Sequence, residues 1–230
     1  MRAAVLSAGL AAVFAGQAMA ADAPLAAWNW TGCHAGVHVG GLWGDESWTN
    51  RAQGGAYSGQ GLGSHDVGGV IGGPQGGCDY QFAGHIVLGI EGSYAWSDAS
   101  GSHPSLHETG VTYGSGAQSL GTLTARAGYA WDTILGYIKV GAAWEDDEVW
   151  ASTTRIGLAY RGEPTRTGWT VGAGAEYAFS PQFSAFVEYD YYDFGTDRIG
   201  LTAQIAGLRP AAVDLSQNRS AMSVGVNYRF

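Results

Sequence analysis

Apolar and polar side chains alternate with a period of two along the last third of the chain. The alternation is clearest in residues 169–179, 183–192 and 221–230. In the first of these segments Val171 belongs to the apolar set, whereas Glu176 belongs to the small and charged set between the apolar positions. Successive side chains of a β-strand point to opposite faces, so the pattern predicts strands with one apolar and one polar face.

The rest of the chain contains five more strands by the same criterion. They are predicted at residues 28–43, 67–78, 85–97, 120–130 and 134–144. Short connections are expected at residues 79–84, 131–133 and 180–182, and long polar loops at residues 44–66, 98–119, 145–166 and 195–218. Short turns at one rim and long loops at the other are typical of bacterial outer-membrane barrels. The predicted fold class is therefore all-β, an eight-stranded antiparallel up-and-down transmembrane β-barrel.

The composition agrees with an exterior that faces lipid. Only 13% of the residues are charged, whereas the chain has 38 Gly, 9 Trp and 12 Tyr. Because an unpaired backbone amide is costly in hydrocarbon, a sheet that spans a membrane must close on itself. Aromatic residues near the strand ends are expected at the two headgroup levels: Trp43, Trp96, Tyr129, Trp144, Tyr177 and Phe230. In the alternative, a soluble β-sandwich, the same rings would anchor the core.

The first twenty residues have the pattern of an export signal. Arg2 precedes an apolar stretch, and the small residues Ala18 and Ala20 mark a cleavage site. We therefore predict a signal peptide at residues 1–20, one barrel domain at residues 21–230 and residence in the Gram-negative outer membrane. No later segment of the sequence has 18 consecutive apolar residues, so a transmembrane helix is not expected.

Several motifs together carry a resemblance to a known family. They are Trp-Thr-Gly-Cys at residues 30–33, the segments 72–82, 168–178 and 187–195, and the terminal Gly-Val-Asn-Tyr-Arg-Phe at residues 225–230. The chain resembles the outer-membrane immunogenic proteins of alphaproteobacteria, small porin-like barrels related in architecture to the OmpA-type membrane domain. The resemblance implies an eight-stranded outer-membrane barrel and a C-terminal signal, Tyr228 and Phe230, that the barrel-insertion machinery reads.

The chain departs from the pattern of this family at Pro74, inside the second predicted strand. Proline has no backbone N–H to donate to a neighbouring strand. We therefore expect a β-bulge or a locally unpaired position there, and the register of this strand is left open.

Strand parity places seven charged side chains in the barrel lumen. They are Glu91, Arg126, Lys139, Glu176, Glu188, Asp190 and Arg229. Eight strands enclose an interior only wide enough for side chains to fill, so these groups are expected to form a paired plug together with His34 and His38. An ion pathway with a charged constriction is the alternative.

Cys33 and Cys78 are the only cysteines of the sequence, and the predicted export signal leads to an oxidising compartment. Cys33 lies near the start of the first predicted strand and Cys78 at the end of the second. Antiparallel pairing brings both residues to the same rim, so a disulfide is predicted there. Two free, lipid-facing thiols are the alternative.

The chain offers little for catalysis or metal binding. His103, His107 and Glu108 have a spacing that suits a metal site on a helix, but they lie in a predicted Gly/Ser-rich loop and are expected to be solvated. The acidic run 145–148 is expected to be a solvated loop cluster, with calcium binding as the alternative. We predict no catalytic residues, no cofactor and no metal.

The formal charge of −9 leaves no large basic surface, so nucleic-acid binding is not expected. The predicted partners are outer-membrane lipid, lipopolysaccharide and the barrel-insertion machinery, besides an unidentified host or surface ligand. The predicted function is that of a non-enzymatic structural barrel that presents long extracellular loops and has a mostly plugged lumen. The alternatives are a passive porin for small hydrophilic solutes and a loop-mediated adhesin or haem-binding protein.

Overall fold

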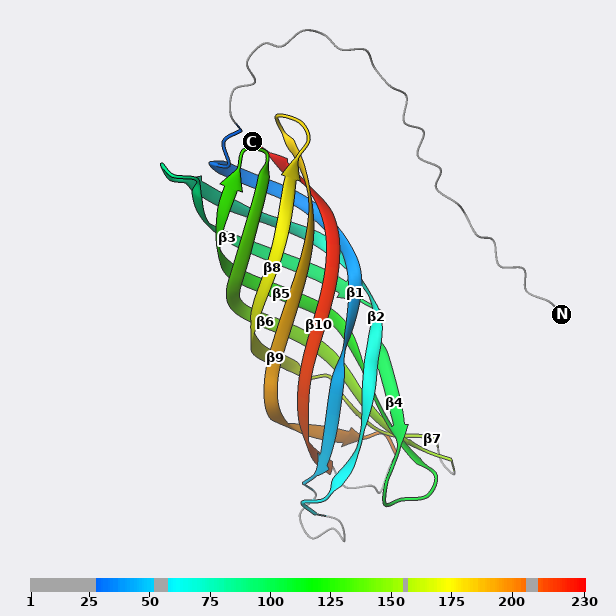
Figure 1. Cartoon of the computed structure of the whole chain (residues 1–230). Coiled ribbons are helices and arrows are strands. Elements are labelled where there is room, and N and C mark those ends of the chain that lie inside the picture. Colours follow the sequence, from blue (N-terminus) through cyan, green and yellow to red (C-terminus); the bar gives the residue numbers. More distant parts are fainter. Residues whose placement is uncertain (1–27, 52–57, 155–156, 206–210) are drawn as a thin grey trace, which may run out of the picture.

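The computed structural model describes residues 28–51, 58–154, 157–205 and 211–230, so the predicted signal peptide lies outside the described residues. Within these ranges the chain forms ten strands (Figure 1): β1 Gly32–Asn50, β2 Gly61–Gln81, β3 Ile86–Ser97, β4 Ser100–Pro104, β5 Val111–Trp131, β6 Ile134–Thr153, β7 Gly157–Gly162, β8 Thr165–Ala178, β9 Phe183–Ala203 and β10 Ala211–Arg229. The described residues include no helix long and apolar enough to cross a membrane.

Eight of the described strands form a closed, antiparallel ring in the order β1, β2, β3, β5, β6, β8, β9 and β10. The ring closes where β1 runs beside β10, from His34 opposite Arg229 to Asn50 opposite Val213 (Figure 1). The short strand β4 continues β3, and β7 leads into β8, after breaks of two residues. The predicted all-β, eight-stranded up-and-down barrel is therefore confirmed, with two of its strands interrupted.

In the half of the barrel that contains the C-terminus, apolar side chains cover the outside. Val37 and Ile138 are each 63% exposed, whereas Glu176, on the inward face, is 1% exposed. The six aromatic residues predicted for the girdles are all exposed: Trp43, Trp96 and Trp144 on one side, and Tyr129, Tyr177 and Phe230 near the C-terminus. We call the region between these two sets the apolar band, and the two barrel ends the terminal end and the distal end.

The height of the apolar band matches a membrane. Ile134 and Trp144 of β6 are both exposed and lie ten positions apart. At a rise of ~3.4 Å per residue and a tilt of ~40°, ten residues cover about 25 Å along the barrel axis, which is the height of the lipid-facing band of a transmembrane barrel.

Beyond the band, towards the distal end, the polarity of the two faces is reversed. On β1 the exposed residues are Asp45 and Ser47, whereas Trp48 is 1% exposed. On β10 Ser216 is exposed and Leu215 is fully buried. An apolar cluster fills the interior there: Trp48, Leu62, Tyr113, Val149, Ala151, Ile199, Leu201, Val213 and Leu215. The distal half thus has the side-chain distribution of a water-soluble β-barrel, with an apolar core and a polar exterior.

This reversal corrects the prediction of four long polar loops. The strands continue far into the segments assigned to loops, so the distal connections shrink to residues 51–60, 105–110, 154–156 and 204–210. The prediction failed because it required an apolar outer face of every strand. Outside the apolar band an apolar outer face is not required, while the hydrogen bonds between neighbouring strands continue.

The register at Pro74 is regular. Pro74 lies opposite Val37 of β1 without a shift, and β2 keeps one register with β3 on both sides of it. The ladder with β3 has pairs at Gly72 and Gln75 but none at the two positions between them. Of the two expected outcomes, the locally unpaired position is the observed one.

Candidate functional site

Charged side chains fill the barrel interior at the level of the apolar band, and we call them the band cluster. The seven residues predicted for the lumen all lie there with at most 7% exposure: Glu91, Arg126, Lys139, Glu176, Glu188, Asp190 and Arg229. They come from six strands, because the interior position of each strand alternates with a lipid-facing one.

Arg126 of β5 is the centre of one half of the band cluster. Its Nε and Nη2 donate to the two carboxylate oxygens of Asp79 at 2.8 and 2.9 Å. Nη2 also donates to Glu176 at 3.1 Å, and Nη1 donates to Glu91 at 3.3 Å. Arg229 of β10 donates to Asp79 at 3.1 Å. One buried guanidinium therefore faces three buried carboxylates from three other strands.

Lys139 of β6 is the centre of the other half. Its Nζ donates to Glu188 Oε1 at 2.5 Å and lies 3.3 Å from Asp190 Oδ1. The second oxygen of Glu188 accepts a hydrogen bond from the Tyr137 hydroxyl at 2.9 Å. Glu91 Oε1 lies 3.6 Å from the same ammonium group, so Glu91 links the two halves into one network.

Asp79 was missed in the sequence analysis, which assigned it to a turn. Because β2 continues to Gln81, the alternation carries Asp79 inward directly after the exposed Cys78. Extending the period-two pattern by one residue would have found it. His34 joins the network as expected, with its ring nitrogens 3.5 Å from Asp79 and 3.4 Å from Glu91.

Little free space remains beside the Lys139 half. His38, Gln75, Lys139 and Glu188 line a cavity of about 20 Å³. A water molecule needs about 10–15 Å³ of such volume. The cavity therefore has room for about one water molecule and not for a hydrated solute.

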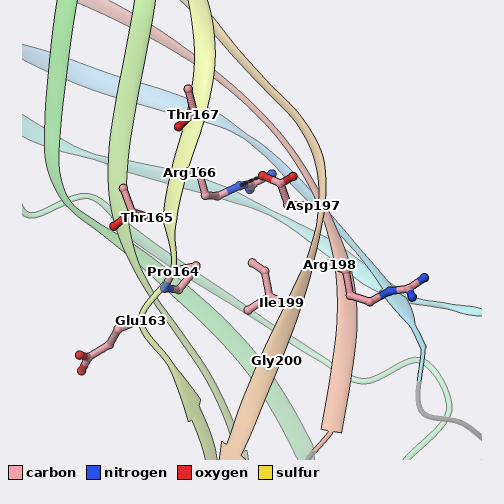
Figure 2. A pocket seen from close by; sticks show the side chains of 9 residues that line it. All are labelled: Glu163, Pro164, Thr165, Arg166, Thr167, Asp197, Arg198, Ile199 and Gly200. Carbon is pink, nitrogen blue, oxygen red and sulfur yellow. Dashed lines mark ion pairs between the residues drawn. The ribbon is translucent and has the colours of Figure 1, made fainter.

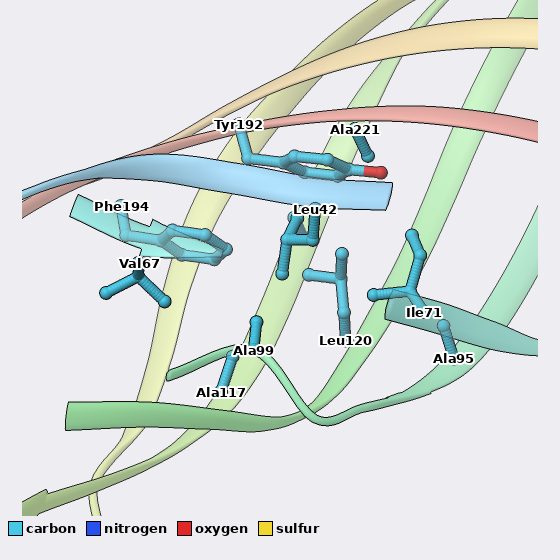
Figure 3. Close-up of a cluster of buried hydrophobic side chains, with 11 residues drawn as sticks. Leu42, Val67, Ile71, Ala95, Ala99, Ala117, Leu120, Tyr192, Phe194 and Ala221 are labelled. Atoms are coloured by element: carbon cyan, nitrogen blue, oxygen red, sulfur yellow. The ribbon is translucent and has the colours of Figure 1, made fainter. Parts of the chain in front are cut away.

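Apolar layers cover the band cluster on both sides. On the distal side, Leu42, Leu120, Tyr192 and Phe194 belong to a buried cluster that projects from several strands into the interior (Figure 3). At the terminal end Trp30 is fully buried, donates its indole N–H to the Asp132 carbonyl at 3.1 Å, and lies under the guanidinium of Arg229. Residues 28–31 precede β1, so this part of the predicted first strand is a cap on the barrel end instead.

A second charged group, the distal cluster, lies beyond the apolar layer of Figure 3. Its members are 0–2% exposed: Glu46, Glu145, Asp147, Arg166 and Arg219. Arg219 Nη2 lies 3.6 Å from Glu46 and 3.4 Å from Glu145. The expectation that acidic run 145–148 is a solvated loop cluster is therefore wrong for two of its four residues.

The calcium alternative for this run also fails. Residues 145–148 are part of β6, so their side chains alternate between the two faces. Asp146 accepts hydrogen bonds from Ser119 and Thr165 at 2.9 and 2.7 Å, and Glu148 pairs with Arg161 at 3.0 Å, on the side away from Glu145. Among the described residues no group of three or more His, Cys, Asp or Glu side chains is arranged to hold a metal ion.

Burial controls the protonation of the distal cluster. It raises the pKa of the Glu46 carboxyl, against the opposing effect of the Arg219 guanidinium. Burial, and then the adjacent carboxylate of Glu145, raise the pKa of Asp147 well above its ordinary value. Burial therefore favours the protonated form of both the Glu46 and the Asp147 carboxyl.

His103 is not the solvated loop residue that was expected. It lies in β4, is 7% exposed, and its Nδ1 is 2.8 Å from Nδ1 of His65. His65 Nε2 is 3.0 Å from the Ser115 hydroxyl, which donates to Glu46. Burial, with the nearby His103 and Arg219, lowers the pKa of His65 from 6.5 to about 4. Burial also lowers the pKa of His103, so both imidazoles are neutral at neutral pH.

Comparison with known proteins agrees with this architecture. The family of outer membrane protein β-barrel domains matches residues 8–230. The chain belongs to this family. The 31 kDa outer-membrane immunogenic protein of Brucella melitensis is 30% identical over 252 residues, which cover 98% of this chain and 99% of the relative. The 25 kDa outer-membrane immunogenic protein of Brucella canis is 27% identical over 148 residues, 63% of this chain and 59% of the relative.

Among solved structures, OprG of Pseudomonas aeruginosa superposes with a TM-score of 0.52 at 13% identity, covering 88% of this chain and 98% of OprG. The outer membrane protease OmpT of Escherichia coli gives a TM-score of 0.56 at 10% identity, covering 90% and 99% of the two chains. These likenesses concern the fold. Together with the immunogenic-protein relatives, family membership places this outer membrane β-barrel protein in the Gram-negative outer membrane.

The predicted disulfide of this outer membrane β-barrel protein is confirmed. Cys33 and Cys78 lie directly opposite each other in the β1–β2 ladder and are bonded. They lie on the outer face at the terminal end, where neighbouring strands are already paired. Tyr228 and Phe230, the residues assigned to the insertion signal, are 46% and 73% exposed at the same end.

Proposed function

We propose that this outer membrane β-barrel protein is a closed, non-enzymatic anchor that holds a rigid β-structure above the outer surface of the membrane. In this proposal residues 1–20 direct export, residues 21–230 form the barrel, and the distal half faces outward. The short turns at the terminal end, and the position of residues 28 and 230 at that same end, support this orientation. The finding that carries the proposal is the apolar layer of Leu42, Leu120, Tyr192 and Phe194 between two charged clusters.

A closed lumen is supported by the order of the layers along the axis. A hydrated solute that entered from the terminal end would meet Trp30, then the band cluster, then the apolar layer, and then the distal cluster. Ions are strongly hydrated, and a transfer into an apolar layer without paired groups costs many kcal/mol. The paired charges of the band cluster, with opposite signs in contact, also lack the single-sign ring that favours ion selection.

The distal half supports a role at the surface. Eight hydrogen-bonded strands with an apolar core form a stiffer platform than four free loops would, and binding residues commonly lie on tips that such a scaffold positions. In the proposed setting its partners are outer-membrane lipid, lipopolysaccharide and an extracellular ligand. The barrel-insertion machinery would bind the C-terminal segment with Tyr228 and Phe230.

Planar-bilayer recording tests the proposal. The purified, folded chain is expected to give no stable conductance, whereas a passive porin would conduct as prepared. A stable conductance that disappears on a blocking substitution at Glu176 or Arg126 would refute the closed lumen. Loop-dependent binding of haem or of host surface components, with the lumen still silent, would identify the adhesin or haem-binding alternative.

A further inference from the structure

Among the described residues of the distal half, the barrel wall is open between β8 and β9. Pairing of these strands ends at Trp169 opposite Asp193. Further on, β9 meets β7 at only two pairs, Tyr160 with Ala203 and Arg161 with Thr202. Between these points β9 is paired with β10 alone. We call this opening the slit.

Local sequence explains why the slit does not close. Gly195 has φ +65°, a conformation that favours glycine, and the register of β9 against β10 shifts there, between Gln217 and Asn218. Pro164, on the opposite side, has no backbone N–H to donate across the gap. Both sides are therefore built so that pairing is interrupted.

The slit contains a cavity of about 480 Å³ (Figure 2). Six polar residues line it: Arg166, Arg198, Glu163, Asp197, Thr165 and Thr167. The Arg198 side chain points away from Arg166 and Asp197 (Figure 2), and its Nε lies 3.2 Å from Asp214. The formal charges cancel, and hydrogen-bond donors and acceptors are mixed. This composition disfavours both an acyl chain and a simple anion, and it suits a ligand with many hydroxyl groups.

One buried donor in the slit has no hydrogen-bond partner. Arg166 is 1% exposed, and its Nη atoms donate to Gln217 and to the Leu215 carbonyl, the latter at 2.9 Å. Its Nε makes no hydrogen bond, and the nearest carboxylate oxygen, of Asp197, is 3.5 Å away (Figure 2). The side chain of Asp197 is 53% exposed, so a ligand hydroxyl can reach it from the solvent side.

The ends of the slit limit the shape of the ligand. A Cβ built on Gly162 would lie 3.2 Å from the Gly200 carbonyl oxygen, and one built on Gly168 would lie 2.3 Å from that of Asp193. The two sides therefore converge at both ends. An extended peptide that adds a strand needs a continuous free edge, which this short opening does not provide.

We propose that the slit binds a hydroxyl-rich saccharide, with sugar hydroxyls accepting from Arg166 Nε and donating to Asp197 and Glu163. Arg166 lies three positions from the exposed Trp169, at the edge of the apolar band, so the slit is at headgroup height. This placement, which rests on the proposed outward orientation, favours the core sugars of lipopolysaccharide. A free oligosaccharide has the same chemistry.

Binding to the full chain, folded in detergent micelles, tests the proposal. The probes are rough lipopolysaccharide, its delipidated core oligosaccharide, and phosphatidylglycerol as a lipid without sugar. Gly200→Trp introduces a large ring at the slit, because Gly200 lines it and no atom lies within 4 Å of a Cβ at this position. Gly61→Trp is its control, since the nearest atom there is 4.0 Å away and the site lies outside the slit.

A second pair of variants isolates the charge in the slit. Arg198 and Arg51 both pair with Asp214, at 3.2 and 2.6 Å, but only Arg198 lines the slit. Arg198→Gln and Arg51→Gln therefore remove equivalent surface ion pairs. Heat-modifiable migration in gels confirms that each variant is folded.

Gly200→Trp should weaken lipopolysaccharide binding by about tenfold or more, and Arg198→Gln by a smaller factor, whereas both controls bind as the wild type does. Binding of the free oligosaccharide as well shows that the sugar suffices, and binding of lipopolysaccharide alone shows that the lipid anchor contributes. The proposal would be overturned if neither lipopolysaccharide nor the free oligosaccharide binds, if Gly200→Trp binds lipopolysaccharide as the wild type does, or if phosphatidylglycerol binds equally well. Conductance, measured separately, tests the closed lumen and does not affect this result.

Discussion

Replacement of Arg126 by methionine should destabilise the barrel more than any change in surface charge. Arg126 is 3% exposed and donates four hydrogen bonds to three carboxylates, those of Asp79, Glu91 and Glu176. Methionine replaces the aliphatic stem of arginine and has no charge. The substitution therefore leaves the three carboxylates in place and removes the cation that faces them.

Removing one partner of a buried ion pair typically costs about 3–5 kcal/mol, because the remaining charge is left desolvated. Here Arg229 still pairs with Asp79, and Lys139 still lies 3.6 Å from Glu91, so part of the charge remains compensated. Glu176 loses its closest cation, since the next guanidinium, of Arg229, is 3.9 Å away. We therefore expect a loss of about 3–5 kcal/mol rather than a multiple of it.

The loss is measured by urea unfolding of the protein from lipid vesicles, followed by tryptophan fluorescence and by gel migration. Arg161→Met is the matched control: Arg161 pairs with Glu148 at 3.0 Å, but its side chain is 40% exposed, so the cost should be at most about 1 kcal/mol. Adding Glu176→Gln to the Arg126 variant should restore part of the stability. A loss of about 1 kcal/mol or less for Arg126→Met would refute the claim that Arg126 compensates three buried carboxylates.

Four further outcomes follow from the structure. Replacing Cys33 and Cys78 by alanine should lower the free energy of unfolding by about 2–4 kcal/mol, because the bond closes a loop with a sequence separation of 45, and reductant should then no longer change the unfolding curve. Trp48→Ala should cost about 3–5 kcal/mol in the same assay, since a fully buried ring of the distal core is removed. The pKa of His65 is about 4 in the folded state and 6.5 ordinarily, so the unfolded chain binds more protons between these values and stability falls as the pH decreases from 6.5 to 4. His65→Gln should flatten this fall. A parallel fall in the wild type and the variant contradicts the assignment. The pKa of Asp147 is raised in the folded state, so the folded chain holds a proton that the unfolded chain releases, and stability falls as the pH rises above the ordinary carboxyl range. Asp147→Asn should therefore gain stability relative to the wild type from pH 5 to pH 8. No such gain would show that the carboxyl is ionised in the folded state.

The membrane part of the fold was predictable because its two environments are chemically distinct. Lipid on one side and packed charges on the other give each strand two unlike faces, and Glu176 and Glu188 could be assigned to the interior from alternation alone. Asp79 escaped because the predicted strand ended one residue too early. The disulfide partners followed from strand order, since Cys33 and Cys78 stand at the same end of neighbouring strands.

The distal half was not predictable by the same rule. Trp48 and Leu215 were assigned to loops because their neighbours Asp45, Ser47 and Ser216 are polar, and a polar outer face was taken as the end of the strand. The alternation itself continues there with the opposite sign. Glu46 and Arg219 pair between the first and last strands of the ring, β1 and β10, which are far apart in sequence and become neighbours only where the barrel closes.

The reversal of polarity also explains why one chain holds two kinds of core. Within the band, lipid stabilises the apolar exterior, so the interior is free to hold charges, provided that they pair. Beyond the band, water covers the exterior, and the hydrophobic effect favours apolar residues inside, as in the cluster around Trp48 and Leu215, alongside the charges of the distal cluster. A strand that crosses this boundary has its apolar residues on the outer face within the band and on the inner face beyond it. On β1 the change lies at Leu42, which is 1% exposed, and Trp43, which is 45% exposed. The apolar layer around Leu42 is thus a consequence of the crossing, and the same layer separates the two charged clusters. In the function that we propose, a lumen closed at this level is a consequence of continuing the barrel beyond the band, and recognition is left to the outer wall and the distal tips.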